Sequence, residues 1–426
     1  MSDTKVLTIG ILAHVDAGKT SITESLLHYS GATTSLGSVD KGSAITDDLA
    51  MEKRRGISIK SSIVNFSWNN TLFQLVDTPG HLDFAAEVDR SLSILDAVIL
   101  VVSAKEGVQA HTINLWESLV ERKLPIIVFF NKIDRDGVDV ETIFLDFQKD
   151  LGAKLFALNF PNLSIPQSPE LVEFTNCENH IDSAILDKSM ENLAEYDEQF
   201  LEKYIEGDTS NLKHVLENGK HYIQSGALYA SLFGSAKLGL GITDLLNCIS
   251  SLVPISKTSY SSTAAKVFKV HFDEKKGRLA YIKSYGTTLK SKDLIYSQYL
   301  DKDIKINQIL KPKLGTLIQC SELHPGEIGV ITTSELIQSG DVLGTENLSD
   351  KHAKISHAVL GVQVEAKDEK DYQKLGDALD ILNLEDPKLD FKWFKEEKEF
   401  HVKILGPIQT EVLKENLLER WGVEAN

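Results

Sequence analysis

Cysteine is scarce in this sequence, and long uninterrupted apolar runs are missing. The 426 residues include three cysteines, which lie far apart and show no CxxC spacing. A disulfide framework and a cysteine zinc site are therefore not expected, and a reducing cytoplasm is the predicted location. The N-terminus lacks the charged and then apolar pattern of a signal peptide, and charges such as Asp96 interrupt the apolar runs. We therefore expect a cytoplasmic protein that makes no membrane contact.

Basic residues are also fewer than acidic ones, 45 against 62, so the formal net charge is −17. Taken alone, this sign disfavours a nucleic-acid partner. More than half of it, however, lies between Glu170 and Lys220, where thirteen acidic and four basic residues give −9. Because salt screens exposed charges beyond about 8–10 Å, a local acidic segment leaves room for basic contacts elsewhere. The net charge therefore does not exclude a partner that contains RNA.

Three regions differ in their hydrophobic patterns. Over residues 1–252, apolar runs alternate with helical stretches, which predicts a parallel sheet covered by helices on both faces. An acidic, helical insertion is expected at residues 155–225. The predicted strands of the sheet are Val6–Leu12, Ile63–Trp68, Leu72–Val76, Ala97–Val102, Ile126–Phe130 and Leu228–Phe233.

Two smaller regions follow a linker that ends at Ser262. Residues 263–350 show short alternating segments broken by glycines, which predict an antiparallel β-barrel. Residues 356–426 show the order βαββα, which is a ferredoxin-like split βαβ fold without its last strand. That strand would begin near Gly422. We therefore expect a fragment, or a naturally shortened protein, in which the last sheet position is empty or filled by very few residues.

The segment AHVDAGKT, Ala13 to Thr20, has the spacing of a phosphate-binding loop after a predicted strand. In such a loop, backbone N–H groups surround the phosphates, Lys19 reaches the β and γ oxygens, and the Thr20 hydroxyl binds Mg²⁺. Gly18 allows the backbone to approach closely. The nucleotide contacts predicted for this loop are His14, Val15, Asp16, Ala17, Gly18, Lys19, Thr20 and Ser21.

Two further motifs add a metal and a γ-phosphate contact. DTPGH begins with Asp77 at the end of a predicted strand, where a carboxylate can hold a metal-bound water. The Gly80 N–H can donate to the γ-phosphate. RGIS lies in the polar stretch before the second strand and places the Ser58 hydroxyl as a second Mg²⁺ ligand.

The motif NKID predicts that the base is guanine. The Asp134 carboxylate can accept two N–H bonds from guanine, and adenine offers neither donor in that place. Lys132 would lie over the base, and Asn131 would tie this loop to the phosphate loop. In the motif GSA, the Ala236 N–H could reach guanine O6. The remaining contacts predicted for GSA and its neighbour are Ser235 and Lys237.

Each of these motifs alone could be a structural turn, but five in the expected order favour a GTP site with bound Mg²⁺. Together, AHVDAGKT, RGIS, DTPGH, NKID and GSA resemble the signature of the translational GTPases. The branch in question contains elongation factor G, the class-II release-factor GTPase and the tetracycline-resistance ribosomal protection proteins. The resemblance covers the whole chain. The segments most similar to the protection proteins are residues 37–58, 103–112 and 278–293.

The sequence differs from the family pattern in two places. Ser58 stands where most members have threonine, although the hydroxyl is kept. Members of the elongation-factor-G and protection types also have two further domains after the position that corresponds to Asn426. The family fold implied is a P-loop GTPase domain, a β-barrel and a ferredoxin-like domain.

The resemblance implies a monomeric GTPase that the ribosome stimulates and that alternates between GTP and GDP. A protection-type protein would bind the ribosome with GTP and leave after hydrolysis. His81 would orient the attacking water. Val15 and Ile57 would keep His81 away from the phosphate until the ribosome is contacted, although ordinary packing explains these two residues equally well. Asp16 would bind a monovalent cation, although an aspartate at such a loop position is more often a turn former. The alternatives are a GTP-dependent competitor or regulator without productive hydrolysis, and a release-factor or elongation-type GTPase.

Overall fold

The computed structural model describes residues 5–35, 37, 52, 58–161, 171–173, 183–206, 212–254, 260–273, 276–348 and 360–426. The chain divides into two compact units. The first unit comprises residues 1–57, 64–80 and 95–256. The second unit comprises residues 58–63, 81–94 and 257–426, so two short segments of the N-terminal half belong with the C-terminal half.

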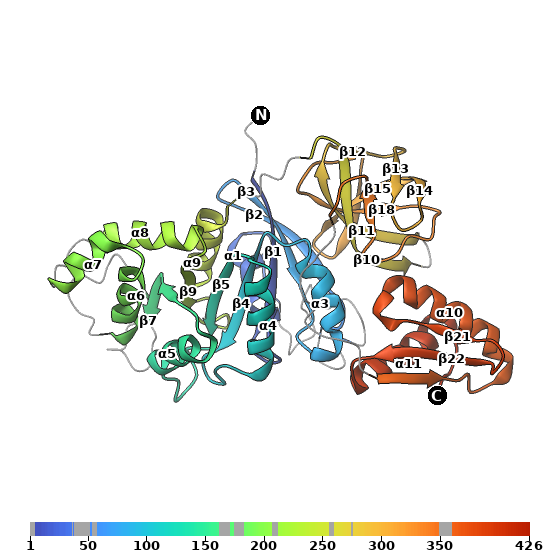
Figure 1. Cartoon of the computed structure of the whole chain (residues 1–426), viewed down its shortest axis with the longest axis horizontal. Coiled ribbons are helices and arrows are strands. Elements are labelled where there is room, and N and C mark those ends of the chain that lie inside the picture. Colours follow the sequence, from blue (N-terminus) through green and yellow to red (C-terminus); the bar gives the residue numbers. More distant parts are fainter. Residues whose placement is uncertain are drawn as a thin grey trace. The chain divides into compact units, whose positions relative to one another are not determined.

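A seven-stranded sheet with the order β2-β3-β1-β4-β5-β9-β6 forms the centre of the first unit (Figure 1). The five neighbouring pairs from β3 to β6 in this order are parallel. Every residue of β4 is buried, which requires cover on both faces and agrees with the predicted fold class. The strands are β1 Lys5–Ala13, β2 Ser62–Trp68, β3 Thr71–Asp77, β4 Ala97–Ser103, β5 Ile126–Asn131, β6 Leu155–Ala157 and β9 Tyr229–Phe233.

Helices follow the strands of this sheet, and local residues define their ends. In α5, the Asp139 side chain accepts hydrogen bonds from the N–H groups of Glu141 and Thr142, and Gly152 ends the helix with φ 61°. No helix in the described ranges combines the length and apolar character required to span a bilayer. The helices that accompany the sheet are α1 Lys19–Tyr29, α4 Ala110–Glu121, α5 Val140–Leu151 and α9 Ile242–Leu252.

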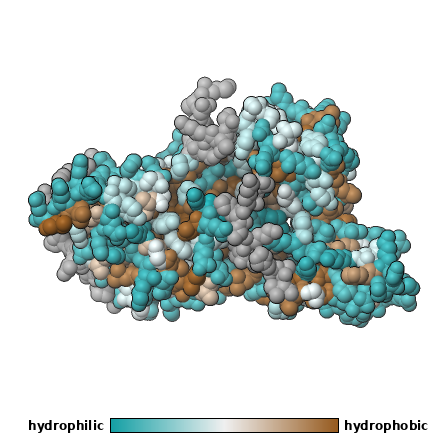
Figure 2. All heavy atoms as spheres, in the orientation of Figure 1, coloured by the Kyte–Doolittle hydropathy of each residue, from teal (hydrophilic) through white to brown (hydrophobic). Residues whose placement is uncertain are grey.

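The segment predicted as a helical insertion, residues 155–225, begins with a strand and not with a helix. Its first three residues form β6, which pairs in parallel with β9 and so belongs to the main sheet. A three-residue strand is too short to show a period in the sequence. Hydrophilic side chains cover most of the visible surface of α7 and α8 (Figure 2), as expected for an acidic helical segment. The other elements here are β7 Asn159–Pro161, β8 Leu171–Glu173, α6 Ala184–Ala194, α7 Glu198–Ile205 and α8 Leu212–Gln224.

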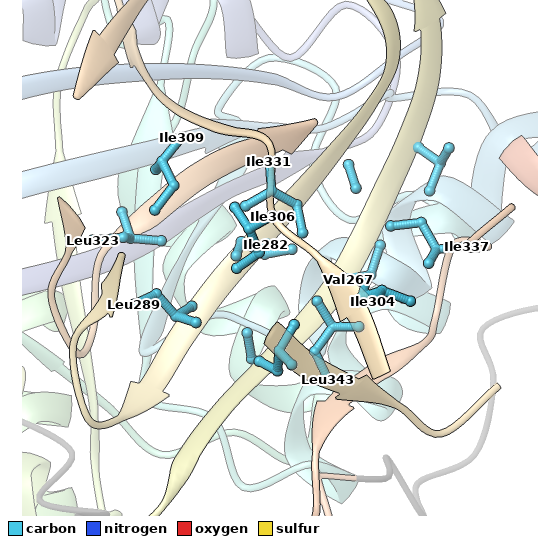
Figure 3. Packing of buried hydrophobic residues seen from close by; sticks show 14 residues of the cluster. Val267, Ile282, Leu289, Ile304, Ile306, Ile309, Leu323, Ile331, Ile337 and Leu343 are labelled. Carbon is cyan, nitrogen blue, oxygen red and sulfur yellow. The ribbon is translucent and has the colours of Figure 1, made fainter. Parts of the chain in front are cut away.

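An eight-stranded antiparallel sheet forms the first part of the second unit, with the order β14-β13-β19-β10-β11-β18-β15-β16. Side chains from several strands, among them Val267, Ile282 and Ile331, point toward one apolar core (Figure 3). This agrees with the predicted antiparallel β-rich region. Its strands are β10 Thr263–Asp273, β11 Gly277–Gly286, β12 Leu289–Lys290, β13 Leu294–Ser297, β14 Lys302–Lys305, β15 Gln308–Lys313, β16 Thr316–Cys320, β17 Glu322–Leu323, β18 Ile328–Thr332 and β19 Val342–Gly344.

The C-terminal region has the predicted order βαββα. Its sheet has the order β20-β22-β21 and packs the buried Phe400 and Val402 against helix residues such as Leu375 and Leu417. Just after β20, Glu365 exchanges two backbone hydrogen bonds with Asn426, of 2.9 and 3.2 Å. The elements are β20 Leu360–Val364, α10 Tyr372–Glu385, β21 Lys392–Phe394, β22 Glu399–Ile404 and α11 Pro407–Trp421.

The core of the antiparallel sheet provides a test of this packing. Ile282 is 0% exposed, so Ile282→Ala should remove about 2–5 kcal/mol from the free energy of unfolding, because it leaves a cavity. Urea denaturation followed by circular dichroism measures the change. Ile318 in the same sheet is 48% exposed, and Ile318→Ala should change the stability by less than about 1 kcal/mol. Equal losses in both variants would contradict the described core.

Candidate nucleotide site

Three of the predicted motifs follow strands that end at one edge of the parallel sheet. β1 ends at Ala13, β3 at Asp77 and β5 at Asn131. Because neighbouring parallel strands run in the same direction, their carboxyl ends meet at one edge, which is where ligands bind in such sheets. The motif GSA follows β9, which is parallel to β5 and ends at Phe233. The fold therefore collects four separate sequence motifs at a common edge.

The phosphate loop has the backbone that its sequence requires. Gly18 has φ 95° and lies immediately before α1, which begins at Lys19. A Cβ atom at this position would lie 2.3 Å from the Asn131 Nδ2 atom, so a larger residue does not fit. Asp16 also has a positive φ, of 65°. The N-terminus of α1, with its partial positive charge, therefore lies directly behind the loop, as an anion site requires.

Lys19 and Asp77 form a buried ion pair across this loop. The second carboxylate oxygen, Asp77 Oδ2, is buried and has no hydrogen-bond partner among the described residues. Buried polar atoms are almost always satisfied, so an oxygen of this kind fits a bound water or ion. Hard oxygen ligands are those that Mg²⁺ prefers. The donor set formed by Thr20 and Asp77 therefore fits the predicted metal.

Asn131 joins the phosphate loop to the loops expected to hold the base. Its Nδ2 donates to the Ala17 carbonyl at 2.9 Å, and its Oδ1 accepts from the Ala236 N–H at 3.0 Å. The first bond is the link that the sequence predicts. The second differs from the expectation, because the Ala236 N–H predicted to meet guanine O6 is directed at Asn131 instead. A neutral amide can satisfy both loops because it carries a donor and an acceptor.

A backbone hydrogen bond joins the two segments that are predicted to bind the base. The Ile133 N–H donates to the Gly234 carbonyl at 3.3 Å, which joins NKID to GSA. Asp134, the last residue of NKID, is half-buried. Lys132 has φ 66°, and its Nζ lies 3.5 Å from Glu106. The first unit thus holds together residues 14–21, Asp77, Gly80, residues 131–134 and residues 235–237. Their contacts with a nucleotide stay predictions.

His14 is held in place by other residues of the protein. The ring is buried, and its Nδ1 lies 3.4 Å from the Thr112 hydroxyl of α4. Burial lowers the pKa of His14 and outweighs the nearby charge of Glu106, which acts to raise it. The imidazole is therefore neutral near pH 7. The contact predicted between His14 and the nucleotide stays a prediction.

The other predicted catalytic and metal residues belong to the second unit. His81 precedes a short helix, η1 Leu82–Phe84, and its Nδ1 accepts from the Asp83 N–H at 3.2 Å. Ser58 is half-buried. Ile57 and the first two residues of RGIS lie outside the described residues. The roles predicted for Ser58 and His81 at the nucleotide therefore stay predictions.

The second unit contains a charged cluster that no sequence motif predicts. Glu385, at the end of α10, accepts two hydrogen bonds from Arg420, at 2.8 and 2.9 Å. It also accepts from the Phe272 N–H at 2.9 Å and lies 3.9 Å from Lys60. A cavity of about 120 Å³ adjoins this cluster and is lined partly by Lys60 and Glu385. These residues come from distant parts of the chain and form no local motif, so only the fold reveals them.

Two family models match the sequence and together cover most of it. The elongation factor Tu GTP binding domain matches residues 4–255, and elongation factor G, domain III matches residues 355–426. Both matches agree with the resemblance inferred from the motifs. The second match falls on the βαββα region.

Individual relatives are similar over almost the whole chain. Tetracycline resistance protein TetP of Clostridium perfringens is 36% identical over 425 residues, and a transposon-borne TetM of Enterococcus faecalis is 36% identical over 423 residues. Each alignment covers 99% of this chain, which spans 64% of the length of these relatives. A crystal structure of a protein from Thermus thermophilus matches with a TM-score of 0.84 and 26% identity, covering 99% of this chain and 67% of that one.

Base recognition provides the first test of this site. Asp134→Asn should lower the affinity for GTP by at least about ten-fold and raise the affinity for xanthosine triphosphate, because an amide can donate to the C2 oxygen of xanthine. Competition against a fluorescent guanine nucleotide measures both affinities. Asp136→Asn alters a neighbouring exposed carboxylate and should change neither. Unchanged GTP binding in Asp134→Asn would show that the base lies elsewhere.

The Glu385 cluster should make stability depend on pH. Burial acts to raise the pKa of the Glu385 carboxyl, but the charges of Lys60 and Arg420 outweigh it and lower that pKa below the ordinary value. A carboxylate with a lowered pKa stabilises the fold fully above its unfolded pKa of about 4.3, and this stabilisation is lost as the pH falls toward the folded pKa.

Glu385→Gln should therefore lower the free energy of unfolding by about 3 kcal/mol near pH 7, because two largely buried cations lose their partner. The difference from the wild type should narrow below about pH 4. Urea denaturation from pH 7 to pH 3 measures this, with Glu369→Gln as the control at an exposed carboxylate of the same region. A difference that stays constant down to pH 3 would show that the fold does not lower the pKa of Glu385.

Proposed function

Because this chain belongs to the family defined by the elongation factor Tu GTP binding domain, we propose that it binds GTP and hydrolyses it when stimulated by the ribosome. One observation carries the proposal: the phosphate loop, DTPGH and NKID follow strand ends at the same sheet edge, and Asn131 bonds to both the Ala17 and Ala236 backbones. Chance turns would not share one edge and one bridging side chain. GTP and GDP are thus the proposed ligands.

The chain's own residues divide the work of binding and hydrolysis. Lys19 and the backbone of the phosphate loop bind the β and γ oxygens, and Asp134 selects guanine. The hydroxyls of Thr20 and Ser58, and Asp77 through a water, hold Mg²⁺, which when bound neutralises charge on the phosphate oxygens.

His81 orients the attacking water, in the proposed mechanism, and the Gly80 N–H donates to the γ-phosphate. Val15 is 41% exposed at the tip of the phosphate loop, which supports its proposed role as one half of an apolar barrier with Ile57. Asp16, held with a positive φ in the same loop, is the proposed ligand of a monovalent cation.

The proposed partner is the ribosome, and the proposed type is ribosomal protection. The identity of 36% to TetP and TetM, which are named tetracycline resistance proteins, supports this type. A protein of this type would act in the cytoplasm as a monomer, bind the ribosome with GTP and leave after hydrolysis. An elongation or release type is the alternative within the family, and the match to elongation factor G, domain III is consistent with it.

Hydrolysis with and without ribosomes tests the proposal. His81→Ala should leave the affinity for GDP within about two-fold of the wild type and lower ribosome-stimulated phosphate release by about 100-fold, a usual scale for losing a group that positions water. His324→Ala alters an exposed histidine of the second unit and should retain wild-type activity.

The outcomes separate the alternatives. Unaltered turnover in His81→Ala would remove this histidine from the mechanism. GTP-dependent ribosome binding by the wild type without stimulated hydrolysis would favour the competitor or regulator. If the wild type does not bind guanine nucleotides, the hydrolase and the competitor or regulator are both contradicted.

A further inference from the structure

The segment that carries His81 is fastened to the C-terminal region through Asp83. The Asp83 carboxylate is buried, and its Oδ2 accepts hydrogen bonds from the N–H groups of Ile408 and Gln409, at 2.9 and 3.3 Å. These N–H groups lie in the first turn of α11, where a helix has unsatisfied donors and a partial positive charge. A carboxylate from a distant segment therefore caps this helix, a role that a side chain adjacent in sequence usually has.

The same aspartate contacts the imidazole of His81 in either protonation state. When His81 is neutral, its Nδ1 accepts from the Asp83 N–H at 3.2 Å. When it is protonated, its Nδ1–H faces Asp83 Oδ1, also at 3.2 Å. Both states occupy Nδ1 and leave Nε2 as the nitrogen available for a water. Asp83 thus contacts both the imidazole of His81 and the first turn of α11, and it links their positions.

Gly406 makes this approach possible. It precedes α11, and a Cβ atom built on it would lie 2.4 Å from one carboxylate oxygen of Asp83 and 2.5 Å from the other. Atoms cannot approach that closely, so any larger residue at this position must displace the carboxylate. Its backbone, with φ −172°, is extended and suits any residue. The three atoms nearest to such a Cβ all belong to Asp83, so the need for glycine comes from this contact and not from the backbone angles.

Two further ion pairs hold the helix that follows, α3 Ala85–Leu92, to the same region. Arg90 donates to Asp386 at 2.7 Å, and Lys388 donates to Asp89 at 2.6 Å. All four side chains are at least partly buried, which limits screening by salt. The segment from His81 to Leu92 is thus attached at both ends to the βαββα region.

We propose that Asp83 is a positioning residue through which α11 sets the orientation of His81. The inference rests on the proposed hydrolysis, because His81 acts on water only there. The βαββα region would then influence hydrolysis at the nucleotide, although it contributes no catalytic residue. A shift of α11 would move Asp83, and with it the imidazole.

Gly406→Ala tests this coupling without altering His81, Asp83 or a predicted nucleotide contact. Gly361→Ala is the matched control, because its Cβ meets no described atom within 4 Å in the same small region. In the full chain with ribosomes, Gly406→Ala should lower kcat for GTP by roughly ten-fold or more, since small displacements of catalytic groups are costly. The KM and the affinity for GDP should stay within about two-fold of the wild type.

A spectroscopic measurement keeps the test independent of hydrolysis. With ¹⁵N-labelled histidine, the neutral His81 ring should show the Nε2–H form in the wild type and in Gly361→Ala, assigned by the signal lost in His81→Gln. Gly406→Ala and Asp83→Ala should show a mixture of both neutral forms, because without the bonds to α11 the backbone N–H of residue 83, from which Nδ1 accepts, is no longer held in place. Asp83→Asn retains an oxygen that can cap α11, so it should restore part of the activity and of the Nε2–H signal relative to Asp83→Ala.

The outcomes distinguish this inference from the proposed function. A wild type without hydrolysis would overturn the proposed function, and the histidine spectra would still decide whether α11 orients the ring. Unchanged spectra in Gly406→Ala and Asp83→Ala would overturn the inference even if hydrolysis is present. A rise in KM with an unchanged kcat in Gly406→Ala would also overturn it, because the effect would then lie in binding.

Discussion

The side-chain amide of Asn131 is the interaction on which the candidate nucleotide site depends. Its donor reaches the Ala17 carbonyl and its acceptor meets the Ala236 N–H, so one residue at the end of β5 fixes two loops that the chain builds separately. Gly18 lies so near this amide that a Cβ atom there would overlap it. An aspartate at position 131 would have no donor for the carbonyl, and a leucine would satisfy neither loop. The parallel sheet supplies the common edge, and Asn131 sets the spacing along it.

A different constraint governs the second unit, where buried charges are satisfied by partners from distant segments. Glu385 is the centre of one such group, and its partners Arg420, Lys60 and the Phe272 N–H come from a helix, a loop and a strand. Buried ion pairs add little to stability compared with apolar packing, but they tolerate few alternative arrangements. We infer that this cluster mainly specifies how α10, α11 and β10 meet.

The sequence predicted the features that depend on neighbouring residues. The phosphate loop, DTPGH and NKID are short motifs whose backbone and side chains act locally, and their strands were expected within one or two residues of the observed ends. The βαββα order was predicted because apolar residues of α10 and α11 recur with a helical period. Strand β6 was not predicted, since three residues carry no period, and it was assigned to the insertion instead.

Features that depend on distant pairs could not be predicted from one sequence. Asp83 has the appearance of an ordinary polar residue after DTPGH, and Glu385 that of a solvated helix end; their roles depend on Ile408 and Arg420, which only folding brings near. The Ala236 N–H was assigned to the base because the bond to Asn131 was not foreseen.

The contact between Gly406 and Asp83 has a consequence for how such proteins diverge. A methyl group at position 406 and a carboxylate at position 83 exclude each other in this packing, although hundreds of residues separate them. The two positions should therefore change together among descendants of this chain, with a bulkier residue at 406 tolerated only beside a smaller or displaced side chain at 83. A chimera that exchanges the C-terminal region with that of a relative would inherit one member of this pair without the other.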